Sequence, residues 1–83
     1  MLTLIVGEHY AHGMSWLRQN WRVKKLDPQK TRIVTNPDAL RGLTHFHIIW
    51  LDGCRHGQKY GEIRAMFWAR KAPGREITEE FCS

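Results

Sequence analysis

The sequence predicts one α/β domain, built on a small, mostly parallel sheet of three strands with helices packed on it. Two short apolar runs, "LTLIV" and "HIIWL", have the composition of strands that are buried on both faces. Two longer segments, residues 8–21 and 57–71, carry apolar residues at helical spacing. Strands that alternate with helices favour a parallel sheet with right-handed crossovers.

The first half of the chain supplies a strand, a helix and a surface loop. Residues 2–7 form the strand, which ends at a glycine. Residues 8–21 form the helix, in which Gly13 is a weak point because glycine disfavours helix interiors. The apolar stripe of this helix consists of Tyr10, Met14, Leu17 and Trp21. The charged loop that follows contains Asp27-Pro28, a pair that stops a helix.

The second half supplies two more strands and the second long helix. Residues 31–35 form a strand, residues 36–42 a turn or single helical turn, and residues 44–51 a central strand. Residues 57–71 form the helix. Its core stripe consists of Tyr60, Ile63, Met66 and Phe67. Residues 76–83 are a tail, for which an edge strand, a helical turn and disorder all remain open.

The composition is that of one folded domain, which we assign to residues 1–75. The net charge of +5 permits nucleic-acid or acidic-protein partners. Cys54 and Cys82 lie far apart in the sequence and do not form a disulfide framework. The first ten residues have neither a basic region nor a cleavage site, and no apolar run reaches membrane-spanning length. We therefore expect a cytoplasmic protein without membrane contact.

Residues 32–56, "RIVTNPDALRGLTHFHIIWLDGCRH", resemble a segment of helicase and terminase ATPase domains. In those domains a strand leads into a Thr-Pro-Gly-Arg-Leu type motif that touches nucleic acid, and the next strand ends in an Asp-Glu box. Here "TNPDALRG" and "IIWLDG" stand at these places, and residues 2–20 are similar to the preceding strand and helix. The chain also resembles small orphan proteins of actinobacterial phages. The resemblance implies a Rossmann-like or P-loop-like fragment of phage origin.

The sequence departs from the ATPase pattern at the residues that would carry hydrolysis. It has no G-x-x-x-x-G-K-[ST] loop to cradle phosphates. Gly53 stands where a glutamate would orient the attacking water. The resemblance thus implies a scaffold without hydrolysis, in which Asp52 is either a relic of a magnesium site or a polar strand end that caps the next helix. We expect no enzymatic activity and no cofactor.

Two further groups of side chains contain residue types that bind metals or transfer protons, but the sequence does not support either role for them. Zinc ligands could come from His45, His47, Cys54, His56 and Cys82. Their spacing matches no zinc module, so we predict no metal site. Glu8, His9 and His12 offer acid–base groups beyond the first strand, but no nucleophile accompanies them, so we do not assign them a catalytic role.

A row of cations around a tryptophan runs beside the core stripe of the second helix. Its members Arg64, Trp68, Lys71 and Arg75 follow one another at helical spacing, so we expect Trp68 to be partly exposed. Three interpretations stay open. Trp68 is a core-edge residue with solvated neighbours, an anchor of a protein interface, or a platform on which a nucleic-acid base stacks.

The first helix and its loop hold the densest group of cations. They are Arg18, Arg22, Lys24, Lys25, Lys30 and Arg32. Such a run forms a solvated face or contacts phosphates. The chain also has four tryptophans, more than a core of this size readily buries, and Trp16 lies off the apolar stripe. We therefore expect self-association, most simply as a two-fold dimer.

Together these features predict a non-enzymatic, phage-type interaction protein that contacts a protein partner in the host cytoplasm. The alternative is a small basic protein that binds DNA or RNA. The residues expected to make either set of contacts are Arg22, Lys24, Lys25, Arg64, Trp68 and Lys71.

Overall fold

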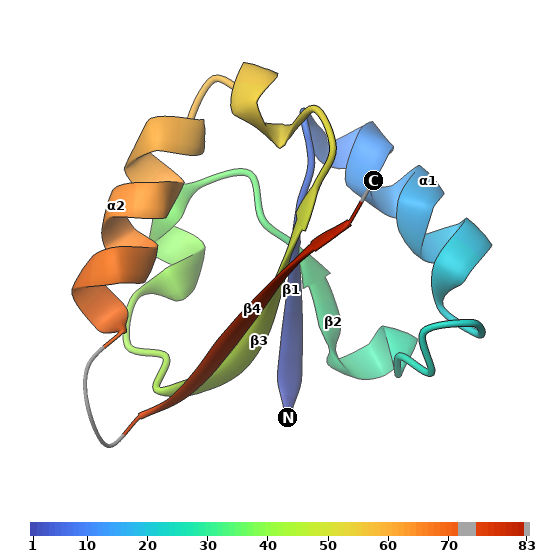
Figure 1. The fold of residues 1–83 in the computed structure, drawn as a ribbon, viewed down its shortest axis with the longest axis horizontal. Helices are drawn as coiled ribbons and strands as arrows, with labels where there is room; N and C mark the ends of the chain where they lie inside the picture. Colours follow the sequence, from blue (N-terminus) through green and yellow to red (C-terminus); the bar gives the residue numbers. More distant parts are fainter. Residues whose placement is uncertain (72–74, 83) are drawn as a thin grey trace.

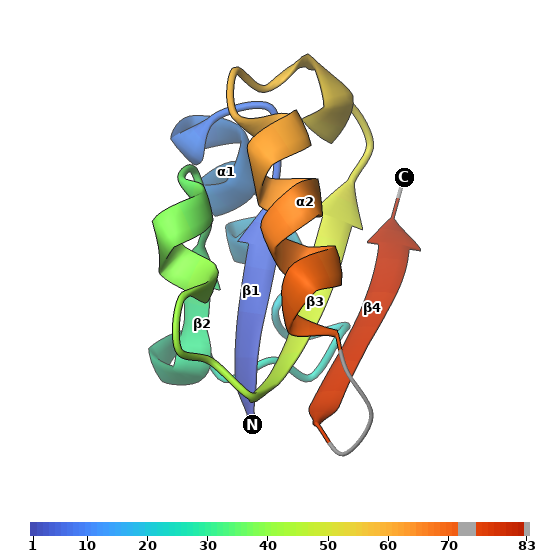
Figure 2. The same cartoon turned by 90° about the vertical axis from the view of Figure 1, so that its left-hand side faces the viewer.

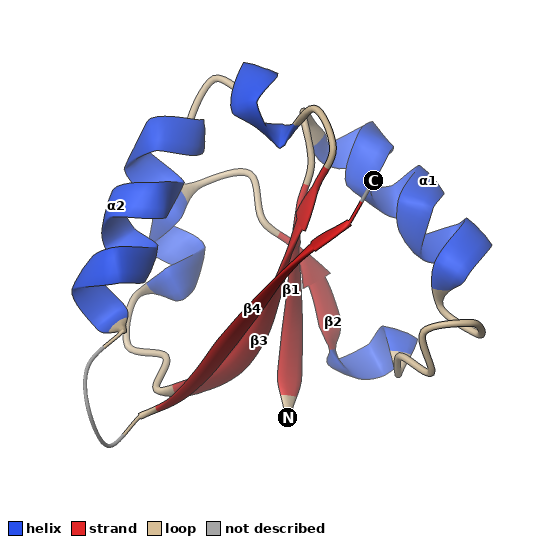
Figure 3. Cartoon of the chain, in the orientation of Figure 1, coloured by secondary structure: helices blue, strands red, loops and turns tan. Residues whose placement is uncertain are grey.

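The computed structural model describes residues 1–71 and 75–82, in which strands and helices alternate along the chain (Figures 1 and 3). In order, the strands and α-helices are β1 (Leu2–Val6), α1 (Tyr10–Asn20), β2 (Thr31–Ile33), β3 (His45–Leu51), α2 (Tyr60–Arg70) and β4 (Glu76–Cys82). Three short 3₁₀ segments lie between them: η1 (Pro28–Lys30), η2 (Pro37–Leu40) and η3 (Cys54–His56). No helix within the described residues is long and apolar enough to cross a membrane.

The strands form a single sheet in the order β2-β1-β3-β4, and all neighbouring pairs are parallel. The predicted α/β class is confirmed, but the prediction of three strands is wrong. The fourth strand, β4, pairs with β3 along its whole length, which places Ile77 beside Phe46 and Phe81 beside Trp50. The tail, for which three conformations were open, therefore contains an edge strand. Its three glutamates hide the strand pattern, because charged residues are depleted in strands.

Helices cover both faces of the sheet (Figures 1 and 2). On one face, Leu17 of α1 packs with residues of β1 and β3, and the partly buried Trp16 and Trp21 join this smaller cluster. On the other face, α2 and η2 cover the larger cluster. Its largest fully buried side chains include Leu4, Leu40, Phe46, Ile48, Trp50 and Phe67. Because the central strands are covered on both faces, their apolar residues do not alternate with polar ones.

Both helices are shorter than predicted. His9 caps α1, so that helix begins two residues later than expected. Lys59 takes the N-cap position of α2, so that helix begins at Tyr60 and not at residue 57. The predicted stripe of α2 is confirmed, since its members are buried or pack against the larger cluster. Tyr10, in contrast, is exposed and not in the core, because the first turn of α1 lies at the carboxyl end of the sheet (Figure 1).

Gly13, predicted to weaken α1, is buried where the helix packs against the sheet. A Cβ atom placed on Gly13 would lie 2.7 Å from Cγ2 of Ile33 on β2. Real Cβ atoms essentially never come that close to another heavy atom. The glycine therefore permits a short helix-to-strand distance, at some cost in helix propensity.

Candidate interaction surfaces

The predicted row on α2 meets β4 to form one continuous patch, which we call the aromatic surface. It consists of Arg64, Trp68, Lys71, Glu79 and Phe81. The first three residues therefore lie together as expected. The fourth member of the predicted row, Arg75, does not belong to the helix, because α2 ends at Arg70. Arg75 instead donates a hydrogen bond to the carbonyl oxygen of Arg70 (3.0 Å).

Arg64 lies among aromatic rings on several sides. Its guanidinium carbon is 4.7 Å from the centre of the Trp50 ring, 5.4 Å from Trp68 and 5.8 Å from Phe81. The Phe67 ring is 5.7 Å away. A cation at these distances from a ring is attracted by the ring's negative face. Arg64 thus joins the buried Trp50 and Phe67 to the two rings that reach solvent.

Glu79 of β4 pairs with both cations of the aromatic surface. Its carboxylate accepts hydrogen bonds from the Trp50 indole nitrogen (3.0 Å), from Arg64 (3.1 Å) and from Lys71 (3.4 Å). Burial alone would raise the pKa of the Glu79 carboxyl group, but these hydrogen bonds outweigh burial and lower the pKa below its usual value. Glu79 is therefore ionised at neutral pH, and it pairs with both cations, so that the three groups together carry a single net positive charge.

Two large rings remain open to solvent on this surface. Trp68 is 54% exposed and Phe81 is 66% exposed. Sequence reasoning identified Trp68 but missed Glu79 and Phe81. The available signal was the period-two spacing of Ile77, Glu79 and Phe81, which puts all three on the face that packs under α2.

A second surface, the basic segment, comprises residues 18–32. This segment contains six cations and one acid, whereas the rest of the chain has seven of each, so it carries the whole excess of five positive charges. All six cations are exposed. The segment runs from the end of α1 to β2, on the side of the molecule away from α2 (Figure 1).

The contacts of the basic segment leave most of its charge facing solvent. Arg22 stacks over the Trp21 ring at 4.9 Å, and Lys25 has a left-handed backbone (φ 57°). Lys24 pairs with Glu80 of β4 at 3.1 Å. The six residues predicted to bind a partner thus divide into two sets. Arg22, Lys24 and Lys25 lie on the basic segment, and the other three lie on the aromatic surface.

Glu80 also anchors a polar network on the face of β3 and β4 opposite the aromatic surface. The His47 ring contacts Glu80 through Nε2 (2.8 Å) and the Thr78 hydroxyl through Nδ1 (2.7 Å). The hydrogen bond from His47 lowers the pKa of the Glu80 carboxyl group, burial opposes this effect, and Lys24 adds to it. Cys82 donates weakly to the same carboxylate (3.5 Å). The network ties the basic segment to the edge strand.

The five side chains considered as zinc ligands do not come together. Cys54 is buried in the larger cluster, on the face under α2, whereas Cys82 packs against the smaller cluster and His47 belongs to the Glu80 network. Within residues 1–71 and 75–82, no group of three or more His, Cys, Asp or Glu side chains is placed to hold a metal ion. Cys54 and Cys82 pack in the two clusters, and the rings of His45 and His47 hydrogen-bond with threonine hydroxyl groups.

Asp52 is the exposed polar end of β3. Its backbone N–H donates to the carbonyl oxygen of Cys82 (2.8 Å). The expectation that its side chain caps the next helix is wrong. Gly53 precedes η3 with a left-handed backbone (φ 88°) and takes the cap position, and no side chain hydrogen-bonds there. A glycine suits this conformation because it has no Cβ atom.

The histidines after β1 cap α1. The backbone N–H of His12 donates to Nδ1 of His9 (3.2 Å), and the backbone N–H of Glu8 donates to Nδ1 of His12 (2.9 Å). The first of these bonds satisfies a backbone donor that the first turn of α1 would otherwise leave open, and the second holds the chain just before the cap. Nδ1 of each ring is therefore engaged at the start of α1.

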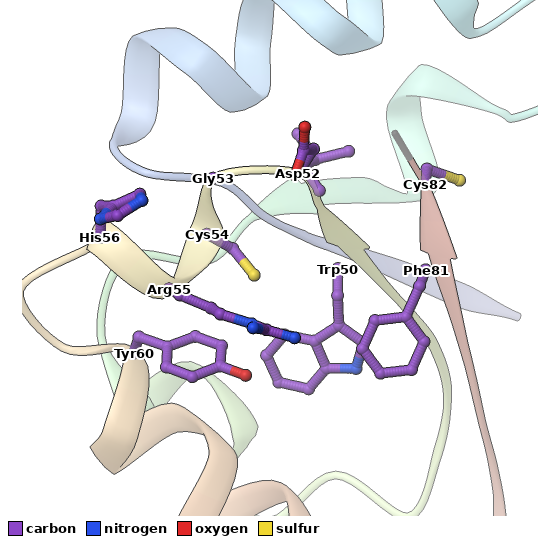
Figure 4. Close-up of a pocket in the computed structure, with 10 residues that line it drawn as sticks. Trp50, Asp52, Gly53, Cys54, Arg55, His56, Tyr60, Phe81 and Cys82 are labelled. Carbon is purple, nitrogen blue, oxygen red and sulfur yellow. The ribbon is translucent and has the colours of Figure 1, made fainter.

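A cavity of about 580 Å³ lies where β3 and β4 end (Figure 4). Parallel α/β sheets bind ligands beyond the carboxyl ends of their strands.

Searches for similar proteins add no assignment, because no family model, curated protein or solved structure matches this chain. The interpretation of its surfaces therefore depends on their geometry and charge.

Proposed function

We propose that this chain is a non-enzymatic interaction module that binds a partner protein through its aromatic surface. The observation that carries the proposal is the exposure of Trp68 and Phe81 beside two cations that are both ion-paired with Glu79. Interface residues that contribute most binding energy are enriched in tryptophan and arginine. A nucleic-acid backbone instead attracts clusters of unpaired cations, whereas both cations of this surface pair with Glu79 and sum with it to a single positive charge.

The outer edge of β4 supports the same proposal. In the described part of the chain, β4 is the last strand of the sheet, so nothing there pairs with its outer edge. The opposite edge strand, β2, has only three residues, whereas β4 has seven. An open edge offers backbone donors and acceptors to an added strand, which is a common mode of peptide recognition. A partner segment along β4 would lie directly beside Phe81.

The strand order also supports a finer description of the fold. We propose that the order β2-β1-β3-β4, with helices on both faces, is a reduced form of the doubly wound, Rossmann-like sheet. Phage origin and action in the host cytoplasm belong to the same proposal, and they depend on the sequence resemblance alone.

Nucleic-acid binding is the second candidate function, and the basic segment favours it. All of the excess positive charge of the chain lies in residues 18–32. A protein that neutralises several phosphates releases condensed counterions, so its affinity falls steeply with salt. Binding of this kind would use Arg22 and Lys25 and would leave Trp68 free.

Two variants separate these functions. Trp68→Ala with Phe81→Ser alters the aromatic surface, and Arg22→Glu with Lys25→Glu alters the basic segment. Lys24 is left unchanged because it pairs with Glu80. Val23→Ala, at an exposed apolar residue in the basic segment, is the matched control for loss of apolar area. Each tagged protein is used to isolate partners from nuclease-treated host extract, and every captured protein is then purified and titrated calorimetrically against each variant.

The proposal expects a purified partner whose affinity falls at least about tenfold in the Trp68/Phe81 variant and is unchanged in the other two. Sedimentation equilibrium provides a further comparison, in which a dimer lost in the Trp68/Phe81 variant would identify a second copy as the partner. Fluorescence anisotropy with DNA and RNA at several salt concentrations tests the second candidate. Salt-dependent binding that only the Arg22/Lys25 variant loses, with no protein partner, would replace the first proposal with the second.

A further inference from the structure

The cavity at the carboxyl ends of β3 and β4 has an aromatic wall. Trp50 packs edge-to-face with Tyr60 (ring centres 6.0 Å apart, planes at 77°) and lies nearly parallel to Phe81 (6.5 Å, 23°). Trp50 is buried, Tyr60 is partly buried and Phe81 is exposed. Figure 4 shows the three rings along one side of the cavity. Such a wall favours a flat, apolar group that can lie against it.

A cation completes the site. The Arg55 side chain extends from the connection after β3 toward the aromatic rings, whereas the Asp52 side chain is directed away from them (Figure 4). Among the described residues, Arg55 has neither an ion pair nor a side-chain hydrogen bond, in contrast to Arg64, which is held by Glu79. The His56 imidazole also lines the cavity. An unpaired guanidinium beside a cavity is suited to a carboxylate or phosphate, which it can bind in bidentate fashion.

From this combination we infer that the cavity binds a small molecule that joins a planar aromatic ring to a carboxylate or phosphate. The ring lies against Tyr60 and Phe81, behind which Trp50 is buried, and the anionic group pairs with Arg55. The volume of about 580 Å³ is within the range of small-molecule sites. This site is distinct from the aromatic surface, although Phe81 borders both, so the inference does not depend on the identity of a protein partner.

The test is an NMR titration of the ¹⁵N-labelled protein with 1-naphthyl phosphate, with 1-naphthol and with inorganic phosphate. The three probes supply ring and anion, ring alone and anion alone. The backbone amides of Gly53, Cys54 and Arg55 report on the cavity. We expect saturable shifts at these groups with 1-naphthyl phosphate, and affinities at least about tenfold weaker for the two partial probes.

Two variants and a control make the result specific. Arg55→Gln and Phe81→Ser change exposed side chains and should keep the fold, yet each should weaken 1-naphthyl phosphate at least about tenfold. Arg41→Gln, at an exposed arginine outside the cavity, should have no effect. The inference is overturned if 1-naphthyl phosphate gives no saturable shift at the cavity or if Arg55→Gln binds it unchanged. Shifts confined to the basic segment would also overturn it, since they would reflect general attraction of anions.

Discussion

Replacement of Glu79 by alanine should destabilise the domain more than replacement of any exposed glutamate. The Trp50 side chain is 1% exposed, so its indole N–H would lose its acceptor where water cannot readily replace it, at a cost of roughly 1–3 kcal/mol. Arg64, whose side chain is 23% exposed, would lose a charged hydrogen bond of similar value. The Lys71 pair adds little, because that side chain is 40% exposed and screened by solvent.

These contributions give a loss of about 3 kcal/mol for Glu79→Ala after partial rehydration of Arg64. For a domain of this size, such a loss lowers the melting temperature by roughly 10–20 °C. Glu79→Gln keeps an oxygen that accepts from Trp50, so it should lose about half as much. Thermal and urea unfolding followed by circular dichroism measure both values.

The matched control is Glu62→Ala on α2. Among the described residues Glu62 pairs with Lys59 alone, at 3.7 Å between side chains that are 64% and 49% exposed, so its loss should cost less than about 0.5 kcal/mol. Equal stabilities of the Glu79→Ala and Glu62→Ala proteins would refute the reasoning, because the contacts of Glu79 would then contribute nothing.

The pH dependence of the same comparison follows from the lowered pKa of Glu79. A carboxyl group whose pKa is lower in the folded state contributes stability above its unfolded pKa, near 4.3, and loses that contribution as the pH falls through the folded value. The difference in unfolding free energy between wild type and Glu79→Gln should therefore be constant from pH 7 to about pH 5 and decrease below about pH 4. A difference that stayed constant down to pH 3 would contradict the assigned role of the charge.

Two further predictions concern glycines and thiols. Gly61→Ala should stabilise α2 by up to about 1 kcal/mol because nothing lies within 4 Å of the added Cβ, whereas Gly13→Ala should destabilise the protein by about 1 kcal/mol because the clash with Ile33 exceeds the gain in helix propensity. Urea unfolding should therefore give changes of opposite sign in the free energy of unfolding of the two variants, and changes of equal sign would be evidence against the close approach of Gly13 to Ile33. Burial raises the pKa of the Cys54 and Cys82 thiols, so at pH 7 both thiols should react with a disulfide reagent at least about tenfold more slowly in the native protein than in urea. The slowing should be larger for Cys54 because it is buried, and equal reaction rates in the native and unfolded protein would contradict the prediction.

Local sequence patterns were sufficient for the elements that carry the core. Strand β3 was predicted from an unbroken apolar run, and α2 from the spacing of Ile63 and Phe67, because a buried strand and an amphipathic helix each leave a periodic signature. Strand β4 lacked this signature. Its glutamates are stabilised by partners far away in sequence, such as Arg64 and Lys71 for Glu79.

The candidate surfaces were predictable to a similar extent. Helical spacing alone placed Trp68 beside Arg64, but only the parallel register of β3 and β4 brings Phe81 to the same patch. The role of Gly13 was misjudged for a related reason, because its value depends on Ile33, which belongs to another element. Propensity describes a residue within its own helix, and contacts between elements can outweigh it.

The separation of the two surfaces has a consequence for how the molecule approaches a charged object. The basic segment lies on the α1 side of the sheet and the aromatic surface on the α2 side (Figure 1). Since the remainder of the chain is electrically balanced, the domain has a dipole moment whose positive pole is the basic segment. Near a polyanion the molecule would rotate until that pole leads, and the exposed tryptophan and phenylalanine would then point outward. Occupation of one side leaves the other accessible, so the two kinds of contact are sterically compatible within one small domain.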